Sequence, residues 1–384
     1  MKIVYNLNSI SYIGGIEHIT VTKANALAEI AGNEVFVFVT DYKPDAGFAP
    51  QLSPKVRLID LEIDYFADDW KSWWHVLKGF CLKRRCHRRR LDQVLREIDP
   101  DIVVSVGGFE KYFLPFIRGR WKLIREFHFI KQYRHLEADS WQKKMTAFLG
   151  DWFEFGWVIR KYDRIVVLTE EDREKHWRGS VRPKVEVIPN ALPVEPRSVS
   201  ALTNKKIVSV GRLSCPKNFQ SLIRAYRRVA DRHPDWELEI YGTGPEWDQL
   251  QTLIASLSLS GQVHLRGHYW PIEEKMAEAS CFVLSSLHEG FGLVLAEAMS
   301  CGLPVVSYAC PCGPRDIIDE GKDGFLVPVG DEAQLAEKIC WLIEHPEERA
   351  VMGEAAREKS ARYGIDRIIP MWMNLFERLR QSKG

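Results

Sequence analysis

Short β-branched runs alternate with longer helical patterns along almost the whole chain, and few folds can accommodate that alternation. Residues 165–168 are apolar at every position, whereas residues 15–31 carry apolar side chains at helical spacing. A strand that is apolar on both faces is typical of a parallel sheet covered by helices on both sides. The predicted strands span residues 2–6, 34–39, 56–60, 102–106, 123–127, 164–168, 206–210, 237–241, 263–266, 281–284, 304–307 and 325–327. The alternation predicts an α/β protein with two doubly wound domains.

A proline-rich segment near the middle of the chain predicts the boundary between the two domains. Residues 189–204 (PNALPVEPRSVSALTN) contain three prolines and no sustained periodicity, which is typical of a linker. We expect an N-terminal Rossmann-like domain over 1–190, a linker at 191–204 and a C-terminal Rossmann-like domain over 205–365. The final helix, within 366–384, could pack on either domain. Two such domains are expected to place the carboxyl ends of both sheets at a shared central cleft, where these folds bind ligands.

The composition excludes several classes of protein. With 384 residues, of which 46% are hydrophobic and 27% charged, the chain is long enough for two or three globular domains. The 53 Lys and Arg nearly balance the 52 Asp and Glu, so the total charge gives no support to nucleic-acid binding. The eight cysteines form no CxxC pair, which favours reduced thiols in a cytosol. Neither a signal peptide nor an apolar stretch of roughly 20 residues is recognisable. We therefore expect a cytoplasmic protein that is soluble or peripheral to a membrane.

Two glycines follow the first predicted strand. Gly14 and Gly15 open the first predicted helix, and glycine there lets a phosphate approach the free N–H groups of the helix. A plain strand-to-helix turn is the alternative interpretation. The pair is not the GxGxxG dinucleotide motif, which disfavours an NAD-binding protein.

Two cations follow the first predicted strand of the second domain. Arg212 and Lys217 lie five residues apart in the loop GRLSCPKN. A guanidinium fork and an ammonium at the carboxyl edge of a sheet suit a diphosphate. Solvated surface side chains are the alternative.

The segment HEGFGLVLAEA, which begins at His288, is the most informative part of the sequence. Glu289 lies in a loop, and Phe291 and Gly292 lie at the entrance of a helix that is apolar except for Glu297. A carboxylate in an apolar helix is costly unless it has a partner. We expect Glu297 to accept hydrogen bonds either from a ribose diol or from an internal salt bridge.

These three segments together resemble the retaining glycosyltransferases of family 4, which have the GT-B fold. The resemblance is strongest over residues 205–329 and looser over the first domain. It implies that Arg212 and Lys217 hold the diphosphate of a nucleotide sugar. Backbone groups at Gly15 and around Phe291, Gly292 and Leu293 would add further contacts.

The resemblance also assigns roles to three side chains that carry acid–base chemistry. Glu297 would bind the nucleotide ribose, and Glu289 would contact the hydroxyls of the donor sugar. His128, which follows a first-domain strand, would face the transferred sugar; a structural histidine is the alternative. The segment CPCGPRD at 310–316 is similar to a variant found in polysaccharide-assembly members.

The sequence implies no metal and no cofactor. The only Asp-x-Asp motif, Asp99 to Asp101, lies between a predicted helix and strand and is interpreted as a cap. The Cys310–Cys312 pair has no accompanying set of metal ligands. A phosphate-binding GxxxxGK[ST] loop is also absent from the sequence.

We expect a retaining, metal-independent glycosyltransferase that moves a hexose or N-acetylhexosamine to a glycan. A UDP-sugar is preferred as donor over GDP-mannose, and a lipid-linked glycan in surface polysaccharide synthesis is expected as acceptor. By resemblance the acceptor attacks on the leaving-group face, but Glu289 could also be a covalent nucleophile. A sugar-nucleotide 2-epimerase and a catalytically silent nucleotide-sugar-binding partner subunit are the alternatives.

A basic, tryptophan-rich segment predicts where the protein works. Residues 70–91 contain eight Lys and Arg, no Asp or Glu, and Trp70, Trp73 and Trp74. Tryptophan beside cations is typical of a helix that lies on an anionic membrane. A second stretch at 141–157 adds aromatic residues, although Asp151 and Glu154 dilute its charge. We expect peripheral binding at the inner face of the plasma membrane; the alternatives are a basic helix docked on the core and a nucleic-acid site.

Overall fold

The computed structural model describes residues 1–11, 14–43, 51–65, 73–136, 138, 140–192 and 196–382, with the backbone alone at 73–78. The chain forms two compact units. The first unit contains Met1–Leu168, Arg173–Pro193 and Ile365–Gly384, and the second contains Thr169–Asp172 and Val194–Gly364. Each unit is described by itself below.

A parallel sheet forms the centre of the first unit, in the strand order β3-β2-β1-β4-β5-β6-β7. The strands are β1 (Lys2–Asn6), β2 (Glu34–Val39), β3 (Val56–Asp60), β4 (Ile102–Ser105), β5 (Lys122–Glu126), β6 (Arg164–Val167) and β7 (Val185–Val187). Side chains alternate between the faces, so Tyr5 belongs to one apolar cluster while Val4 belongs to the other. Both faces are therefore buried, as the apolar strands predict.

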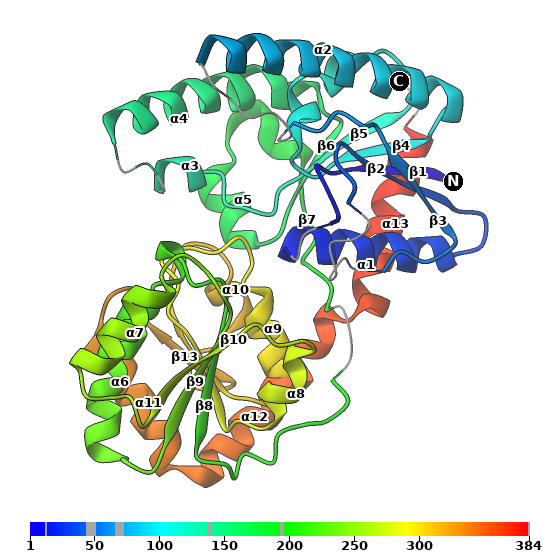
Figure 1. Ribbon diagram of the computed structural model, residues 1–384. Helices are drawn as coiled ribbons and strands as arrows, with labels where there is room; N and C mark the ends of the chain where they lie inside the picture. Colours follow the sequence, from blue (N-terminus) through cyan, green and yellow to red (C-terminus); the bar gives the residue numbers. More distant parts are fainter. Residues whose placement is uncertain are drawn as a thin grey trace. The chain divides into compact units, whose positions relative to one another are not determined.

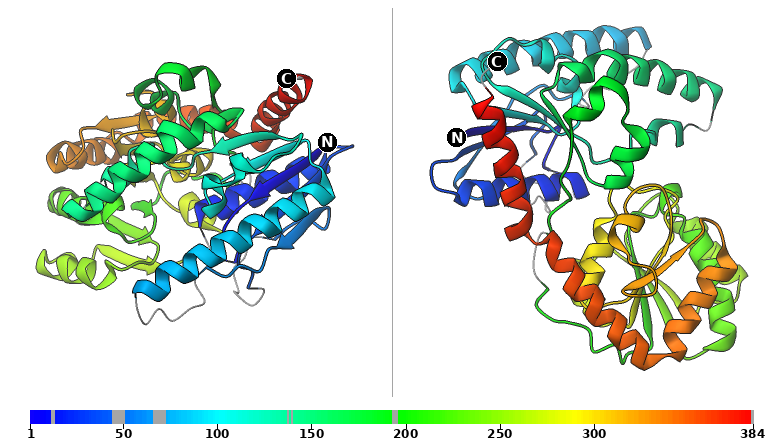
Figure 2. Two further views of the ribbon diagram at one scale, coloured as in Figure 1. Left: turned by 90° about the horizontal axis from the view of Figure 1, so that it is seen from above. Right: turned by 180° about the vertical axis from the view of Figure 1, so that it is seen from behind.

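Helices cover both faces of this sheet (Figure 1). On one face lie α1 (Gly15–Glu29) and the C-terminal helix α13 (Ile365–Gln381), whose Ile368, Trp372 and Phe376 share a core with β1 and β2. On the other lies α2 (Trp73–Ile98), through Leu91 and Leu95. The view from behind in Figure 2 shows α13 running along the first unit. The shorter helices of this region are α3 (Tyr133–Leu136), α4 (Trp141–Phe153) and α5 (Glu170–His176).

The second unit is built on a parallel sheet in the order β10-β9-β8-β11-β12-β13. Its strands are β8 (Lys206–Val210), β9 (Glu237–Tyr241), β10 (Val263–Gly267), β11 (Cys281–Leu284), β12 (Val305–Tyr308) and β13 (Gly324–Val327). Its helices are α6 (Phe219–Arg232), α7 (Trp247–Ser256), α8 (Ile272–Ala277), α9 (Leu293–Ser300), α10 (Pro314–Ile317), α11 (Glu332–Glu344) and α12 (Pro346–Ser360).

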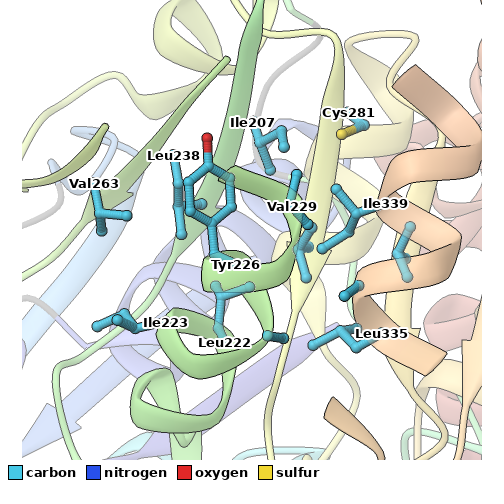
Figure 3. Close-up of a cluster of buried hydrophobic side chains, with 14 of the residues drawn as sticks. Ile207, Leu222, Ile223, Tyr226, Val229, Leu238, Val263, Cys281, Leu335 and Ile339 are labelled. Carbon is cyan, nitrogen blue, oxygen red and sulfur yellow. The ribbon is translucent and has the colours of Figure 1, made fainter. Parts of the chain in front are cut away.

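One large apolar core joins residues of α6, α7, α11 and α12 to the sheet of the second unit. Figure 3 shows Leu222, Tyr226 and Val229 of α6 against Ile207 of β8, with Ile339 of α11 beside them. The Tyr226 hydroxyl donates to the Trp236 carbonyl at 2.7 Å, so this large ring is buried without an unpaired polar atom. The opposite face of the sheet is covered by α8 and α9 (Figure 1). Because α9 is the next element after β11 in the chain, it is entered from the carboxyl end of β11.

The predicted strands are all present, and where their ends differ from the prediction they differ by one residue. The strand β7 was not predicted, because it has three residues and follows a charged segment with Pro183. Residues 196–204 do not behave as a free linker. The Ser200 backbone N–H donates to the Cys301 carbonyl at 2.9 Å, and Arg349 donates to the Leu202 carbonyl at 2.9 Å. Within the described part of the chain, no helix is long and apolar enough to cross a membrane.

Candidate functional site

The N-terminus of α1 directly follows the β1 loop in the first unit. A Cβ built on Gly15 would meet no atom within 4 Å, whereas one on Gly14 would lie 2.0 Å from Glu17 Oε2. The Glu17 carboxylate thus lies over the first turn of α1, at the position that favours an anion. Burial raises the pKa of Glu17, and its own backbone N–H works in the opposite direction. The open space at the start of α1 is therefore beside Gly15, whereas the space beside Gly14 is filled by the Glu17 carboxylate.

His128 lies two residues beyond the end of β5 and is 8% exposed. Its Nε2 is 3.1 Å from Oε1 of Glu126, the last residue of β5. The same oxygen pairs with the ammonium of Lys23 on α1. The sequence analysis did not single out Lys23 or Glu126, although a lysine among the apolar residues of α1 was a visible signal.

The loop between β8 and α6 carries Arg212 and Lys217. Arg212 is exposed, and its guanidinium makes no ion pair or hydrogen bond with the residues that the structure describes. Lys217 Nζ donates to Glu289 Oε1 at 2.6 Å. The two predicted cations are therefore different: Arg212 is open to a ligand, while Lys217 is already paired with another predicted site residue.

Glu289 is held at the carboxyl end of β11 by several contacts. Ser286 Oγ donates to Glu289 Oε1 at 2.6 Å, beside the Lys217 contact. The Glu289 N–H donates to the Pro311 carbonyl at 3.2 Å. Its side chain is 10% exposed. The carboxylate is fixed in one orientation, which suits a group that positions a ligand.

The entrance of α9 presents backbone rather than side chains. Phe291 is 3% exposed, and its ring packs edge-on against Tyr363 at 5.2 Å. Gly292 has φ +84°, and the helix begins at Leu293. A Cβ on Gly313 would lie 1.9 Å from the Phe291 carbonyl oxygen, so glycine is required there. Ligand contacts through the backbone N–H groups around Phe291, Gly292 and Leu293 stay a prediction.

Glu297 lies inside α9, and its carboxyl group has no hydrogen bond or ion pair with any residue that the structure describes. Burial and the charge of Glu273 raise its pKa to about 8. Glu273 is 8% exposed, and its Oε1 also lacks a hydrogen-bond partner. Among the described residues, the internal salt bridge that was the alternative for Glu297 does not occur, so the carboxylate is available to a ligand.

Two further glycines shape this loop cluster, and the sequence analysis did not single them out. A Cβ on Gly242 would lie 1.9 Å from the Gly211 carbonyl oxygen, and one on Gly244 would lie 2.2 Å from the Leu213 carbonyl oxygen. The loops after β8 and β9 therefore touch backbone to backbone. The signal was the sequence YGTG at the end of a strand.

The other residues that the sequence analysis considered as metal ligands, Asp101, Cys310 and Cys312, lie in the following surroundings. Asp101 Oδ2 accepts from the Lys2 backbone N–H at 2.8 Å, which agrees with the predicted cap. Cys310 and Cys312 are fully buried. Burial raises the pKa of both thiols.

Two family models match the chain. Residues 13–195 match Glycosyltransferase Family 4, and residues 195–359 match Glycosyl transferases group 1. The boundary between the matches falls where the two units meet in the sequence.

Three curated proteins are similar in sequence. An exopolysaccharide phosphotransferase of Streptomyces coelicolor is 40% identical over 99% of this chain, which spans 41% of that relative's length. An uncharacterized glycosyltransferase of Haemophilus influenzae is 25% identical over 97% of this chain and 99% of its own. A poly(ribitol-phosphate) α-N-acetylglucosaminyltransferase of Staphylococcus aureus is 27% identical over 56% of this chain and 44% of its own.

Two solved structures have the same fold. Sucrose-phosphate synthase from Thermosynechococcus elongatus has a TM-score of 0.81 at 19% identity, with 100% of both chains covered. HepE of Anabaena, in complex with UDP and glucose, has a TM-score of 0.74 at 20% identity, over 98% of this chain and 100% of that one.

Proposed function

Because the chain belongs to the family 4-type glycosyltransferases of GT-B fold, we propose that it transfers a hexose or N-acetylhexosamine from a UDP-sugar to a glycan hydroxyl. The transfer retains the anomeric configuration and needs no metal. The acceptor is a lipid-linked glycan in surface polysaccharide synthesis. HepE, whose structure contains UDP and glucose, supports a UDP-sugar over GDP-mannose, and the relative named an N-acetylglucosaminyltransferase supports an N-acetylhexosamine.

The observation that carries this proposal is a pair of polar side chains in the second unit that have no partner among the described residues. The Glu297 carboxyl, whose pKa burial raises to about 8, lies in α9, and the exposed Arg212 cation lies in the loop after β8. The two carboxyl oxygens can bond both hydroxyls of a ribose, and a guanidinium fork suits a diphosphate. These are the two recognition elements that a nucleoside diphosphate requires.

The same residues can stabilise the departure of the diphosphate. As the bond from the sugar C1 to the phosphate oxygen breaks, negative charge develops on the diphosphate. Arg212 and the N–H groups at the start of α9 are fixed donors for that charge. Glu289, held by Lys217 and Ser286, would orient the sugar hydroxyls. The acceptor hydroxyl attacks from the leaving-group face and gives its proton to the departing phosphate oxygen.

The test is a transfer reaction with isotopically labelled UDP-sugars and a glycan acceptor, in EDTA. We expect label in the acceptor with retained configuration and stoichiometric release of UDP. Complete loss of activity that a divalent metal restores would reject the metal-free mechanism. Product of inverted configuration would reject retention.

The alternatives give different results in the same reaction without acceptor. A 2-epimerase would convert the donor to its epimer, whereas a transferase would at most hydrolyse it slowly. A silent binding subunit would bind the donor and turn over nothing. Detection of any donor turnover therefore excludes the silent subunit.

We propose that the protein contacts an anionic membrane, and that α4 rather than residues 70–91 forms the centre of the contacting surface. Trp141, Met145, Phe148 and Trp152 lie on one face of α4 and are 51–70% exposed. Such an apolar stripe on a helix surface is typical of an interfacial membrane helix. The sequence analysis expected Asp151 to dilute the positive charge of residues 141–157, but Asp151 pairs with Arg134 at 2.7 Å, so a neighbouring arginine balances its charge.

The basic part of α2 adjoins this helix. A cavity of about 390 Å³ is lined by Arg84, Arg85 and Arg88 of α2 and by Phe153 and Trp157. Phe153 is the last residue of α4, and Trp157 lies in the helical segment that follows it. Figure 1 shows α2 and α4 on the same side of the first unit. Trp70 and the side chains of 73–78 lie outside the described residues. The combination of apolar and cationic side chains supports contact with an anionic membrane.

A further inference from the structure

The first unit contains a buried ion pair whose cost is not explained by packing. Lys23 and Glu126 are each 1% exposed at the side chain and pair through Nζ and Oε1. Taking two such charges out of water costs several kcal/mol per ion, and an apolar pair of similar volume is often equally stable. A pair of this kind at the carboxyl end of a strand is therefore a candidate for a functional role.

Four elements hold Lys23 in place. Its Nζ lies 4.4 Å from the centre of the Trp372 ring on α13 and 5.5 Å from the centre of the Tyr5 ring on β1. Trp372 and Tyr5 are 1% and 0% exposed, so cation–π contacts and Glu126 form the immediate surroundings of the ammonium. Burial lowers the pKa of Lys23, and Glu126 works in the opposite direction.

Glu126 connects this pair to His128. Burial alone would raise the pKa of Glu126, but Lys23 and His128 lower it to about 2, so the group is a carboxylate. The negative charge of this carboxylate attracts an N–H and repels a lone pair, so it favours the proton on the imidazole nitrogen that faces it, Nε2 at 3.1 Å. The approach has the distance of an ion pair without the alignment of a hydrogen bond. Nδ1 of His128 is buried and has no hydrogen-bond partner in the described residues.

We propose that Lys23 and Glu126 are positioning residues, which fix the tautomer and orientation of His128 so that Nδ1 stays free for the donor sugar. This inference rests on the proposed glycosyl transfer. Lys23 fixes the Glu126 carboxylate, Glu126 fixes the imidazole, and Trp372 makes the arrangement depend on the C-terminal helix. A side chain that is oriented in this way loses less freedom when the sugar binds.

The test is a double-mutant cycle on the full-length protein. Lys23→Met with Glu126→Gln removes both charges without leaving one buried alone. We expect kcat to fall about tenfold or more with the donor KM unchanged, and His128→Ala to lower kcat about 10²-fold. In the His128→Ala background the same pair of substitutions should change kcat less than twofold, because the residues act as one unit. Effects that simply multiply would overturn the proposal.

Two controls separate positioning from general damage. Lys359→Met with Asp323→Asn neutralises a buried ion pair of the second unit, whose atoms are 3.1 Å apart; its effect should be the same in both backgrounds. If the Lys23/Glu126 double variant does not fold, Glu126→Asp keeps the charge but withdraws it from His128, and kcat should still fall in it. An unchanged kcat in Glu126→Asp would refute positioning. Absence of transfer by the wild type would instead refute the proposed function.

Discussion

Arg212, Glu289 and Glu297 carry most of the chemistry argued for the second unit, and they differ in how the protein supports them. Glu289 is fixed by Lys217 and Ser286, whereas Arg212 and Glu297 have no partner among the described residues. A side chain that is fixed by its neighbours can orient a substrate, and a side chain without a partner is available to bind one. The sequence could place these residues at the edge of one sheet, but it could not show that Lys217 binds Glu289, because that contact joins residues from two separate loops.

Arg212 and Glu297 should fail in different ways when they are replaced. The Arg212 contact strengthens as the diphosphate leaves, so Arg212→Ala should lower kcat about 10²-fold. The Glu297 contact to ribose is equal in ground and transition states, so Glu297→Ala should mainly raise the donor KM. Steady-state kinetics measures both, and Arg228→Ala, an exposed arginine of α6, is the control. Wild-type kinetics in both variants would show that the site is elsewhere.

The raised pKa of Glu297 also makes stability depend on pH. The folded protein keeps the carboxyl proton up to about pH 8, while the unfolded chain loses it near the ordinary glutamate pKa of 4.5. The folded state therefore binds more protons between these values, and the free energy of unfolding should fall as pH rises through this window. Denaturant unfolding at pH 5, 7 and 9 should show a steeper decline in the wild type than in Glu297→Gln.

Glu273 provides the matched control for this pH dependence. Its charge is the second cause of the raised pKa of Glu297. Glu273→Gln should therefore reduce the difference between the wild-type and Glu297→Gln stability curves. Curves that run parallel from pH 5 to 9 in all three proteins would contradict the account of a buried carboxyl without a partner.

At the scale of elements, the sequence predicted the strands well because each is a short apolar run bounded by polar or glycine residues. It predicted less well which side chains are exposed and which charges are paired. Residues 141–157 were given less weight than 70–91 because of Asp151 and Glu154, yet Glu154 is 2% exposed and pairs with Arg134. Periodicity cannot show which charges a neighbouring element neutralises. For the same reason the periodicity of α1 did not reveal that Lys23 is buried in an ion pair.

The glycines of the predicted phosphate site should separate function from stability. Gly15 has open space around it, so Gly15→Ala should change the free energy of unfolding by less than about 0.5 kcal/mol. The added methyl group should nevertheless raise the donor KM, because it occupies the place of the phosphate. Gly313 has φ +108° and contacts the Phe291 backbone, so Gly313→Ala should cost about 2 kcal/mol or more. A Gly15→Ala variant with unchanged KM would leave Gly14 and Gly15 as a plain turn.

The α4 stripe and the α2 arginines should act together on a membrane. Trp141→Ser with Phe148→Ser and Trp152→Ser should abolish binding to vesicles that contain anionic lipid, as measured by co-sedimentation. Replacing Arg84, Arg85, Arg88 and Arg89 with Ser should weaken binding and reduce its sensitivity to salt. Arg90 is left unchanged, because its guanidinium donates to the Glu62 carbonyl at 2.8 Å.

Four exposed arginines on other helices provide the control for charge. Replacement of Arg228, Arg357, Arg367 and Arg380 with Ser removes the same total charge and should leave vesicle binding intact. Equal partition of the wild type to neutral and anionic vesicles, or none to either, would refute the membrane proposal. Transfer to a water-soluble acceptor should be unaffected in the α4 variant.

At the scale of the whole molecule, the chemistry divides between the two units. The first contains His128 with its ion pair and the surface that is proposed to contact a membrane, and the second contains the groups that are proposed to bind the nucleotide. The order of motifs in the sequence was enough to predict the family, because three weak motifs in one order are specific together. That the two carboxyl edges share one cleft stays a prediction. The donor sugar could not be predicted, since sequence motifs describe the diphosphate and ribose contacts better than those to the sugar.

Thermal unfolding in the presence of a panel of nucleotide sugars tests the central claim most directly, because a ligand that binds only the native state raises its stability. At a concentration 100-fold above Kd the gain is about 2.7 kcal/mol. We predict that one UDP-sugar, and UDP itself, raises the Tm of the wild type in EDTA and leaves the Tm of Glu297→Ala almost unchanged, whereas Arg212→Ala, whose contact strengthens as the diphosphate leaves, should keep part of the shift with the UDP-sugar. No shift with any nucleotide sugar, or equal shifts in the wild type and both variants, would contradict a nucleotide-sugar site built on Arg212 and Glu297.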